Sequence, residues 1–178
     1  MKTLTTTRLV IRPLTEADFP AIAAMDSDPE VMRYLALNSA VPTYEKALQQ
    51  VPEILDMPCP EGCGTWVITA RQEGTFIGWV WLAYREGSSD IDFGYRLGKG
   101  CWGNGHATEA GQRVVDHAFR DLELSHLTAV IHPQNMRSIR VVKKIGFKRS
   151  GIEEVFDIFL NRYVLTRECY VEHFVGYS

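Results

Sequence analysis

The sequence feature that most constrains the fold is a run of glycines leading directly into a helical pattern. Four of the eight residues from 98 to 105 are glycine, and small or apolar residues then recur at helical spacing from Ala107 to Ala118. Glycine takes up positive φ at little cost and lets another molecule approach the backbone closely. The free amides and the dipole at a helix start favour an anion. The stretch therefore predicts a binding site for a phosphorylated ligand.

The length and charge of the chain limit its class. Its 178 residues suffice for one domain, spanning residues 1–178, with a core that needs no disulfides. The net charge of -3 offers no basic surface for nucleic acid, and no apolar run approaches the roughly 20 residues that cross a bilayer. The first residues lack the apolar segment and cleavage site of a signal peptide. We expect a cytoplasmic protein with no nucleic-acid or membrane partner.

The cysteines favour reduced thiols over a metal site. Cys59 and Cys63 are close in sequence, but three residues separate them instead of two, and no second Cys/His pair follows at ribbon spacing. A zinc site is the alternative. Reduced cysteines in a proline-rich loop are typical of a cytoplasmic protein, and we therefore expect no metal.

Strand and helix patterns follow one another in the order β, helices, βββ, α, β, α, ββ. This order predicts an α/β (α+β) fold with a mixed sheet that has helices on both faces. Capping residues mark the helix starts: Thr15 begins a capping box with Asp18, and Asp28, Thr43 and Asn135 each begin a helix. The predicted strands cover residues 4–13, 65–70, 75–84, 90–97 and 127–132, a strand from 147, and a last strand over 163–170 with Asn161 near the final turn.

Three phosphate-binding motifs compete for the same glycines. A Walker loop requires Ser or Thr after its lysine, whereas Gly100 follows Lys99, which excludes this motif. Gly98, Gly100 and Gly103 match the dinucleotide pattern GxGxxG, but that pattern belongs in the first turn of a parallel βαβ unit and here follows an antiparallel meander. It stays open as the less favoured alternative. In the third motif, the amides of residues 103–108 turn toward a pyrophosphate.

Two segments resemble the signatures of one enzyme family. Residues 102–110, WGNGHATEA, resemble the (Gln/Arg)xxGx(Gly/Ala) motif of the GNAT N-acetyltransferases. Residues 132–147, HPQNMRSIRVVKKIGF, resemble the second signature of the branch related to the ribosomal-protein alanine N-acetyltransferases, and residues 6–13 and 28–32 fit the same branch. The resemblance covers nearly the whole chain, and its segments lie in the family's order.

The resemblance implies both a fold and a reaction. The fold would be a mixed, mostly antiparallel central sheet of about seven strands, flanked by helices and splayed between the fourth and fifth strands. The reaction would move the acetyl group of acetyl-CoA directly to a primary amine, either a protein N-terminus or a small molecule, in a monomer or homodimer. The resemblance assigns pantetheine contacts to the backbone of Tyr95, Arg96 and Leu97, and pyrophosphate contacts to the amides of Gly103, Asn104, Gly105, His106, Ala107 and Thr108.

The sequence departs from the family pattern where a polar or basic side chain is usual. Trp102 replaces the usual Gln or Arg, and Asn104 stands where a basic residue is common. We expect acetyl-CoA to bind through the backbone amides, although more weakly. A catalytically silent acyl-CoA-binding sensor of the same fold is the alternative function. Basic residues of the later helix would either approach the 3′-phosphate of the nucleotide or form a solvated face: Arg137, Arg140, Lys143 and Lys144.

The resemblance also implies an acid for the departing CoA thiolate. Ser138 matches the family's serine three residues after Asn135, on the same face of the first helical turn. An ordinary helix hydroxyl is the alternative for Ser138, and Asn135 would cap the helix, bond the pantetheine, or do both. The histidines show no triad spacing and Cys101 has no evident partner, so a covalent acyl-enzyme is not expected.

For the base that takes a proton from the amine, the resemblance indicates Asp157 on a closing strand. Its apolar neighbours in EVFDIF would raise its pKa by desolvation; Glu153 and Glu154 are rivals. A strand bulge at Gly94 would free an amide for the oxyanion that forms in acyl transfer. Five further residues would shape the acceptor pocket or belong to the core: Met32, Tyr34, Leu35, Trp79 and Trp81.

Overall fold

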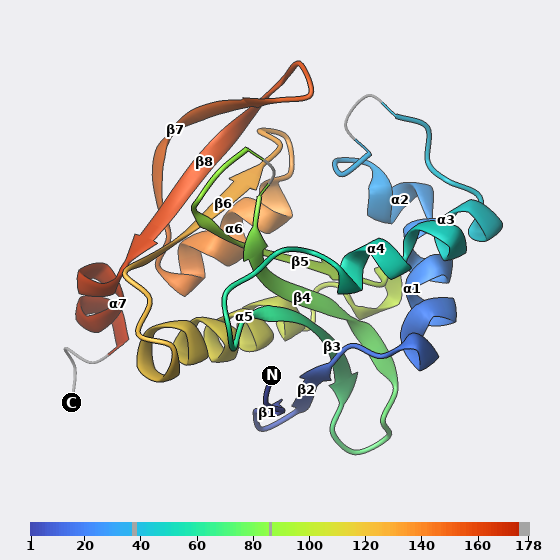
Figure 1. Cartoon of the computed structure of the whole chain (residues 1–178), viewed down its shortest axis with the longest axis horizontal. Helices are drawn as coiled ribbons and strands as arrows, with labels where there is room; N and C mark the ends of the chain where they lie inside the picture. Colours follow the sequence, from blue (N-terminus) through green and yellow to red (C-terminus); the bar gives the residue numbers. More distant parts are fainter. Residues whose placement is uncertain (37–38, 86, 175–178) are drawn as a thin grey trace.

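The chain folds around one open sheet of eight strands, flanked by helices (Figure 1). The computed structural model describes residues 1–36, 39–85 and 87–174. The strand order is β1-β2-β3-β4-β5-β6-β8-β7, antiparallel except for the parallel contact of β5 with β6. The strands are β1 (Leu4–Thr5), β2 (Leu9–Pro13), β3 (Gly64–Ala70), β4 (Phe76–Tyr84), β5 (Ile91–Leu97), β6 (His126–Ile131), β7 (Lys148–Val155) and β8 (Ile158–Thr166).

Helices cover both faces of the sheet. Because successive side chains of a strand point to opposite faces, Val67 of β3 packs with α1 and α3, whereas Trp66 and Ile68 join the core under α5 and α6. No described helix is long and apolar enough to cross a bilayer. The helices are α1 (Phe19–Asp26), α2 (Pro29–Met32), α3 (Tyr44–Gln50), α4 (Pro52–Leu55), α5 (His106–Asp116), α6 (Met136–Ile145) and α7 (Arg167–Phe174).

The predicted helix starts are confirmed. Thr15 and Asp18 form a capping box. The side chains of Asp28, Thr43 and Asn135 each accept a hydrogen bond from a first-turn amide, at 2.8, 3.4 and 3.2 Å. Each cap therefore satisfies an amide that has no partner within its own helix.

The predicted first strand, residues 4–13, is instead two strands. The chain turns between them where the Thr6 amide donates to the Leu9 carbonyl at 3.0 Å. The sheet consequently has eight strands rather than about seven.

The prediction for the closing hairpin is wrong at its turn. The turn lies at Phe156 and Asp157, and Asn161 lies inside β8, opposite Ile131 of β6. Both turn residues take positive φ, 49° and 60°, the conformation of a type I′ turn that usually holds Asn or Gly. Because Phe156 is neither Asn nor Gly, the sequence carries no typical signal for a turn at this position. The predicted last strand ends at Thr166, and residues 167–174 form α7.

Gly94 lies in a continuous stretch of the β4–β5 ladder, and the predicted bulge is absent there. The register runs without a shift from Gly78–Leu97 to Tyr84–Ile91. A Cβ on Gly94 would lie 1.9 Å from Cζ2 of Trp81. Glycine is therefore needed at this position because the Trp81 ring packs directly on the strand.

The predicted divergence between the fourth and fifth strands is confirmed at β5 and β6. Within the described residues these strands pair at Asp92 and Thr128, whereas β6 pairs with β8 along six residues. Strands β5 and β6 are consequently joined near the beginning of β5 and lie apart along the remainder of that strand.

We expect Gly94→Ala to lower the free energy of unfolding by about 2 kcal/mol, because overpacking a core costs roughly 1–3 kcal/mol. That cost exceeds the gain of under about 1 kcal/mol from removing a strand glycine. The matched control is Gly100→Ala, since no described atom lies within 4 Å of a Cβ there. Denaturant titration measures both; equal midpoints for the two variants would contradict the packing role of Gly94.

Candidate active site

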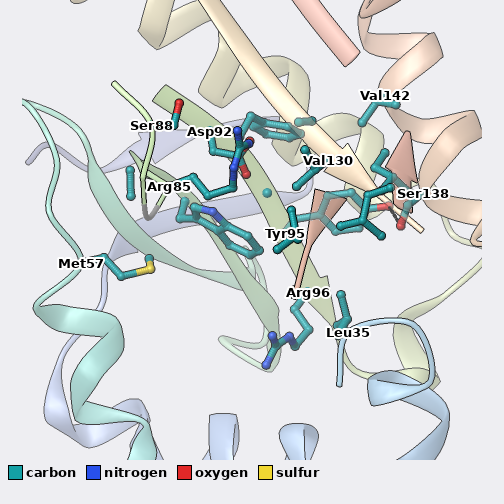
Figure 2. A pocket seen from close by; sticks show the side chains of 18 of the residues that line it. Leu35, Met57, Arg85, Ser88, Asp92, Tyr95, Arg96, Val130, Ser138 and Val142 are labelled. Carbon is teal, nitrogen blue, oxygen red and sulfur yellow. Dashed lines mark hydrogen bonds and ion pairs between the residues drawn. The ribbon is translucent and has the colours of Figure 1, made fainter. Parts of the chain in front are cut away.

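A cavity of about 1060 Å³ opens where β5 and β6 diverge (Figure 2). Side chains of β4, β5, β6 and α6 line it, together with residues that follow α2 and α4. Figure 2 shows Met57 across the cavity from Ser138. Four of the predicted site residues line this cavity: Tyr95, Arg96, Asn135 and Ser138.

A hydrogen bond joins the two sides of the gap. The Tyr95 hydroxyl of β5 donates to Ser138 Oγ at 3.2 Å, and Ser138 lies in the first turn of α6, which Asn135 caps. Burial raises the pKa of Tyr95, and this hydroxyl therefore keeps its proton at neutral pH. A hydroxyl that accepts one hydrogen bond still has its own proton to donate, so Ser138 can serve as an acid.

Two of the three residues assigned to the pantetheine, Tyr95 and Leu97, have their backbone groups directed away from β4. The Gly98 amide donates to the Ile77 carbonyl at 2.9 Å. Because bonding directions alternate along an antiparallel ladder, the backbone groups of Tyr95 and Leu97 point away from β4 and into the gap. The Leu97 carbonyl accepts from Trp102 Nε1 at 2.9 Å, so the Leu97 amide and the amide and carbonyl of Tyr95 are the groups that remain on the side of the gap.

The prediction for Arg96 is wrong in its backbone role. Arg96 pairs with Trp79 of β4, and by the same alternation its amide and carbonyl face that strand. Its side chain crosses to α1, where it forms an ion pair with Asp26, and its guanidinium lies 5.1 Å from the Trp79 ring centroid. Which residues of β5 turn their backbone groups toward β4 depends on the register between the two strands, and the sequence does not specify that register.

The glycine loop has the conformation that a phosphate site needs. Gly103 and Gly105 take positive φ, 81° and 80°, and Gly105 is the N-cap of α5. The amides of residues 106–108 open that helix and therefore have no partner within it. A Cβ at Gly103 would meet no described atom within 4 Å, so the loop is accessible. The loop fits a pyrophosphate held by backbone amides.

Two arginines lie at this loop. Arg8 of the β1–β2 turn donates from Nη1 to the Asn104 carbonyl at 3.0 Å and pairs with Glu109 of α5 at 2.6 Å. The guanidinium of Arg137 lies 4.7 Å from the ring centroid of Trp102. A cation thus stands beside the tryptophan that replaces the usual polar or basic residue.

Asp157 does not have the surroundings predicted for it. It lies in the turn at the tip of the β7–β8 hairpin, which projects from the top of the molecule in Figure 1. Its side chain is exposed, and Phe156 and Phe159 are 68% and 64% exposed. Asp157 is therefore neither on a strand nor desolvated, and it is not among the residues that line the cavity.

Among the described residues that line the cavity, the carboxylate is that of Asp92, which the sequence reasoning missed. It is 8% exposed, and it accepts from Thr128 Oγ1 and Arg85 Nη1, both at 3.1 Å. Burial raises its pKa to about 7, although Arg85 and Thr128 act in the opposite direction. One signal was available: Asp92 is an isolated acid in the otherwise apolar beginning of β5, IDFGYRL.

The comparisons with known proteins agree with this geometry. Residues 8–148 match the model of the acetyltransferase (GNAT) domain. The uncharacterised N-acetyltransferase YoaA of Bacillus subtilis (strain 168) is 31% identical over 150 residues, 84% of each chain. A GNAT-family acetyltransferase from Bacillus anthracis superposes with a TM-score of 0.77 at 23% identity, over 94% of this chain and 99% of that one. AAC(6′)-Ib in complex with ribostamycin and coenzyme A superposes with a TM-score of 0.74 at 21% identity, over 91% and 95%. The chain belongs to the GNAT acetyltransferase family.

Proposed function

We propose that this protein transfers the acetyl group of acetyl-CoA directly to a primary amine. Acetyl-CoA-dependent acyl transfer is the activity of the family, and relatives are named N-acetyltransferases. The observation that carries the proposal is the pair formed by a buried carboxylate, Asp92, and a hydroxyl, Ser138, which line the same cavity. Direct transfer needs a base for the amine and an acid for the leaving thiolate, and this pair supplies both.

Asp92 is the proposed base. An alkyl amine is mostly protonated at neutral pH and must lose a proton before it attacks. The ionised Asp92 carboxylate takes that proton, directly or through one water. Its pKa of about 7 suits this task, since a base works best when its pKa lies near the working pH. Asp157 is the less suitable base, because it is exposed at a hairpin tip.

Ser138 is the proposed acid. Bound acetyl-CoA supplies a thioester carbonyl and a thiolate leaving group. Ser138 donates its hydroxyl proton to that sulfur and takes up the proton of the Tyr95 hydroxyl, which donates to its oxygen at 3.2 Å. Solvent then returns a proton to Tyr95, while Asp92 releases to solvent the proton that it took from the amine. Asn135 keeps its capping role throughout, because its side chain bonds the Ser138 amide and not the hydroxyl.

The first turn of α5 and the loop before it are proposed to hold the pyrophosphate. Backbone amides from Gly103 to Thr108 supply the donors, and Arg137 supplies the positive charge that Trp102 lacks. This cation offsets the loss of charge that suggested the alternative, a catalytically silent acyl-CoA sensor. We further propose that the acceptor is a protein N-terminus or a small molecule, and that the chain belongs to the branch of the ribosomal-protein alanine acetyltransferases. We also propose that the protein is cytoplasmic and is a monomer or a homodimer.

Release of free thiol from acetyl-CoA over a panel of primary amines and N-terminal peptides tests the proposed function. We expect amine-dependent thiol release, with the acetylated amine identified by mass spectrometry. Tight CoA binding without turnover on any acceptor would support the sensor instead. Failure to bind CoA would overturn both functions.

Replacement of Ser138 by alanine is expected to lower kcat about 100-fold, the low end of the usual contribution of general acid catalysis. The KM for acetyl-CoA should change little, because the Asn135 cap bonds the backbone of residue 138 and survives. Steady-state kinetics measure both constants. Ser150→Ala, on β7, is the control; an unaltered kcat in Ser138→Ala would remove Ser138 from the acid role.

The pH dependence of kcat/KM tests Asp92. The pKa of Asp92 is raised to about 7, so the carboxyl is neutral and inactive as a base below that pH. We therefore expect kcat/KM to rise with pH through about 7 in the wild type. Asp92→Asn should lose this limb and lower kcat about 100-fold above it, because the isosteric amide cannot accept the proton.

Asp157→Asn is the matched control for the pH profile. It makes the same chemical change on an exposed aspartate outside the cavity. The profile of this variant should overlay that of the wild type. Loss of the limb in Asp157→Asn, with the limb retained in Asp92→Asn, would assign the base to the hairpin instead.

A further inference from the structure

We propose that the acceptor is a monoamine with an aromatic or other apolar body, and that polycationic amines are excluded. This inference rests on the proposed acetyl transfer and names the substrate class of the same cavity. It follows from the two properties of the cavity wall opposite Ser138: its rings and its charges.

Aromatic rings dominate the wall on the side of α1 to α4. Trp79 and Trp81 of β4 form a tilted pair with ring centroids 4.7 Å apart. Tyr34, which follows α2, stacks with His132, which follows β6, and their ring centroids are 5.3 Å apart. Both residues line the cavity. Trp81 is partly exposed, and its indole lies against Gly94 at the level of the gap. Such rings bury apolar area and prefer stacked or edge-on aromatic partners.

Among the residues that the structure describes, the lining offers no free carboxylate for a second ammonium group. Among the described lining residues, the acidic and basic side chains other than His132 are Asp92, Arg85 and Arg96. Arg85 pairs with Asp92 at 3.1 Å and with Glu153 at 2.6 Å, and Arg96 pairs with Asp26. The one carboxyl among the described lining residues, Asp92, is therefore engaged with Arg85 and needed as the base. Asp26 and Glu153, the other carboxylates at these arginines, are likewise held in ion pairs. A second ammonium would therefore lose its hydration without an unpaired carboxylate among the described lining residues.

The rings themselves do not compensate for this exclusion. Aromatic faces attract cations, but the face of Trp79 is already taken by the Arg96 guanidinium at 5.1 Å. That ring is also buried, so its face is not open to a cation of the ligand. The position favours an uncharged ring or alkyl chain packed beside Trp81.

Two matched pairs of amines test the inference on the wild-type enzyme. Hexylamine and hexamethylenediamine share a chain length and differ in the second ammonium; phenethylamine and ethylamine differ in the ring. We expect kcat/KM about 10-fold or more higher for hexylamine and for phenethylamine than for their partners, which corresponds to about 1.4 kcal/mol or more in each pair. Ribostamycin should be acetylated no faster than hexamethylenediamine.

The variant Trp81→Leu should reduce the ratio of kcat/KM for phenethylamine over ethylamine by about 10-fold. An unchanged ratio would remove Trp81 from the acceptor site. Faster turnover of hexamethylenediamine or ribostamycin than of hexylamine would overturn the monoamine class while leaving acetyl transfer intact. Acetylation of none of these amines and none of the peptides would overturn the proposed function, and the inference with it.

Discussion

The contact between Asp92 and Thr128 is the constraint on which the site depends. Thr128 is fully buried, and its hydroxyl donates to the Asp92 carboxylate at 3.1 Å where β5 and β6 meet. Beyond that contact the strands separate within the described residues, and Tyr95 and Ser138 face each other across the gap. Asp92, whose contact with Thr128 joins β5 to β6, is also the carboxylate whose pKa burial raises to about 7. Position and reactivity thus have the same cause.

The glycine loop depends on residues outside its own motif. The turns at Gly103 and Gly105 require positive φ, but Arg8 fixes the Asn104 carbonyl from the β1–β2 turn, and Arg137 reaches Trp102 from α6. Arg8 pairs its charge with Glu109 and so positions the loop, whereas Arg137 brings a cation to it. The proposed pyrophosphate site therefore has a cation beside it although the loop lacks the usual basic residues.

Local signals predicted much of this architecture. Side-chain caps, the glycine loop and the Asn135–Ser138 spacing are short-range patterns, and the structure has them in the predicted places. The errors arise where distant contacts decide. The direction of the Arg96 backbone depends on register with β4, and Gly94 is explained by Trp81 on another strand. Phe156 has a left-handed backbone conformation that is rare for phenylalanine, so the sequence does not predict a turn there. For that reason Asp157 was predicted on a strand, whereas it lies in the turn. Asp92 was overlooked because its burial is a tertiary property.

The central claim is that the open part of the β5–β6 gap holds the reacting groups. A crystal structure with CoA tests it most directly, because the electron density fixes the sulfur atom. The sulfur should lie within hydrogen-bond reach of Ser138 Oγ, roughly 3–4 Å for a sulfur acceptor, with Asp92 facing the open side of the cavity and the pyrophosphate against residues 103–108. A sulfur atom outside the gap, or one that faces the β7–β8 hairpin tip, would contradict the assignment of acid and base.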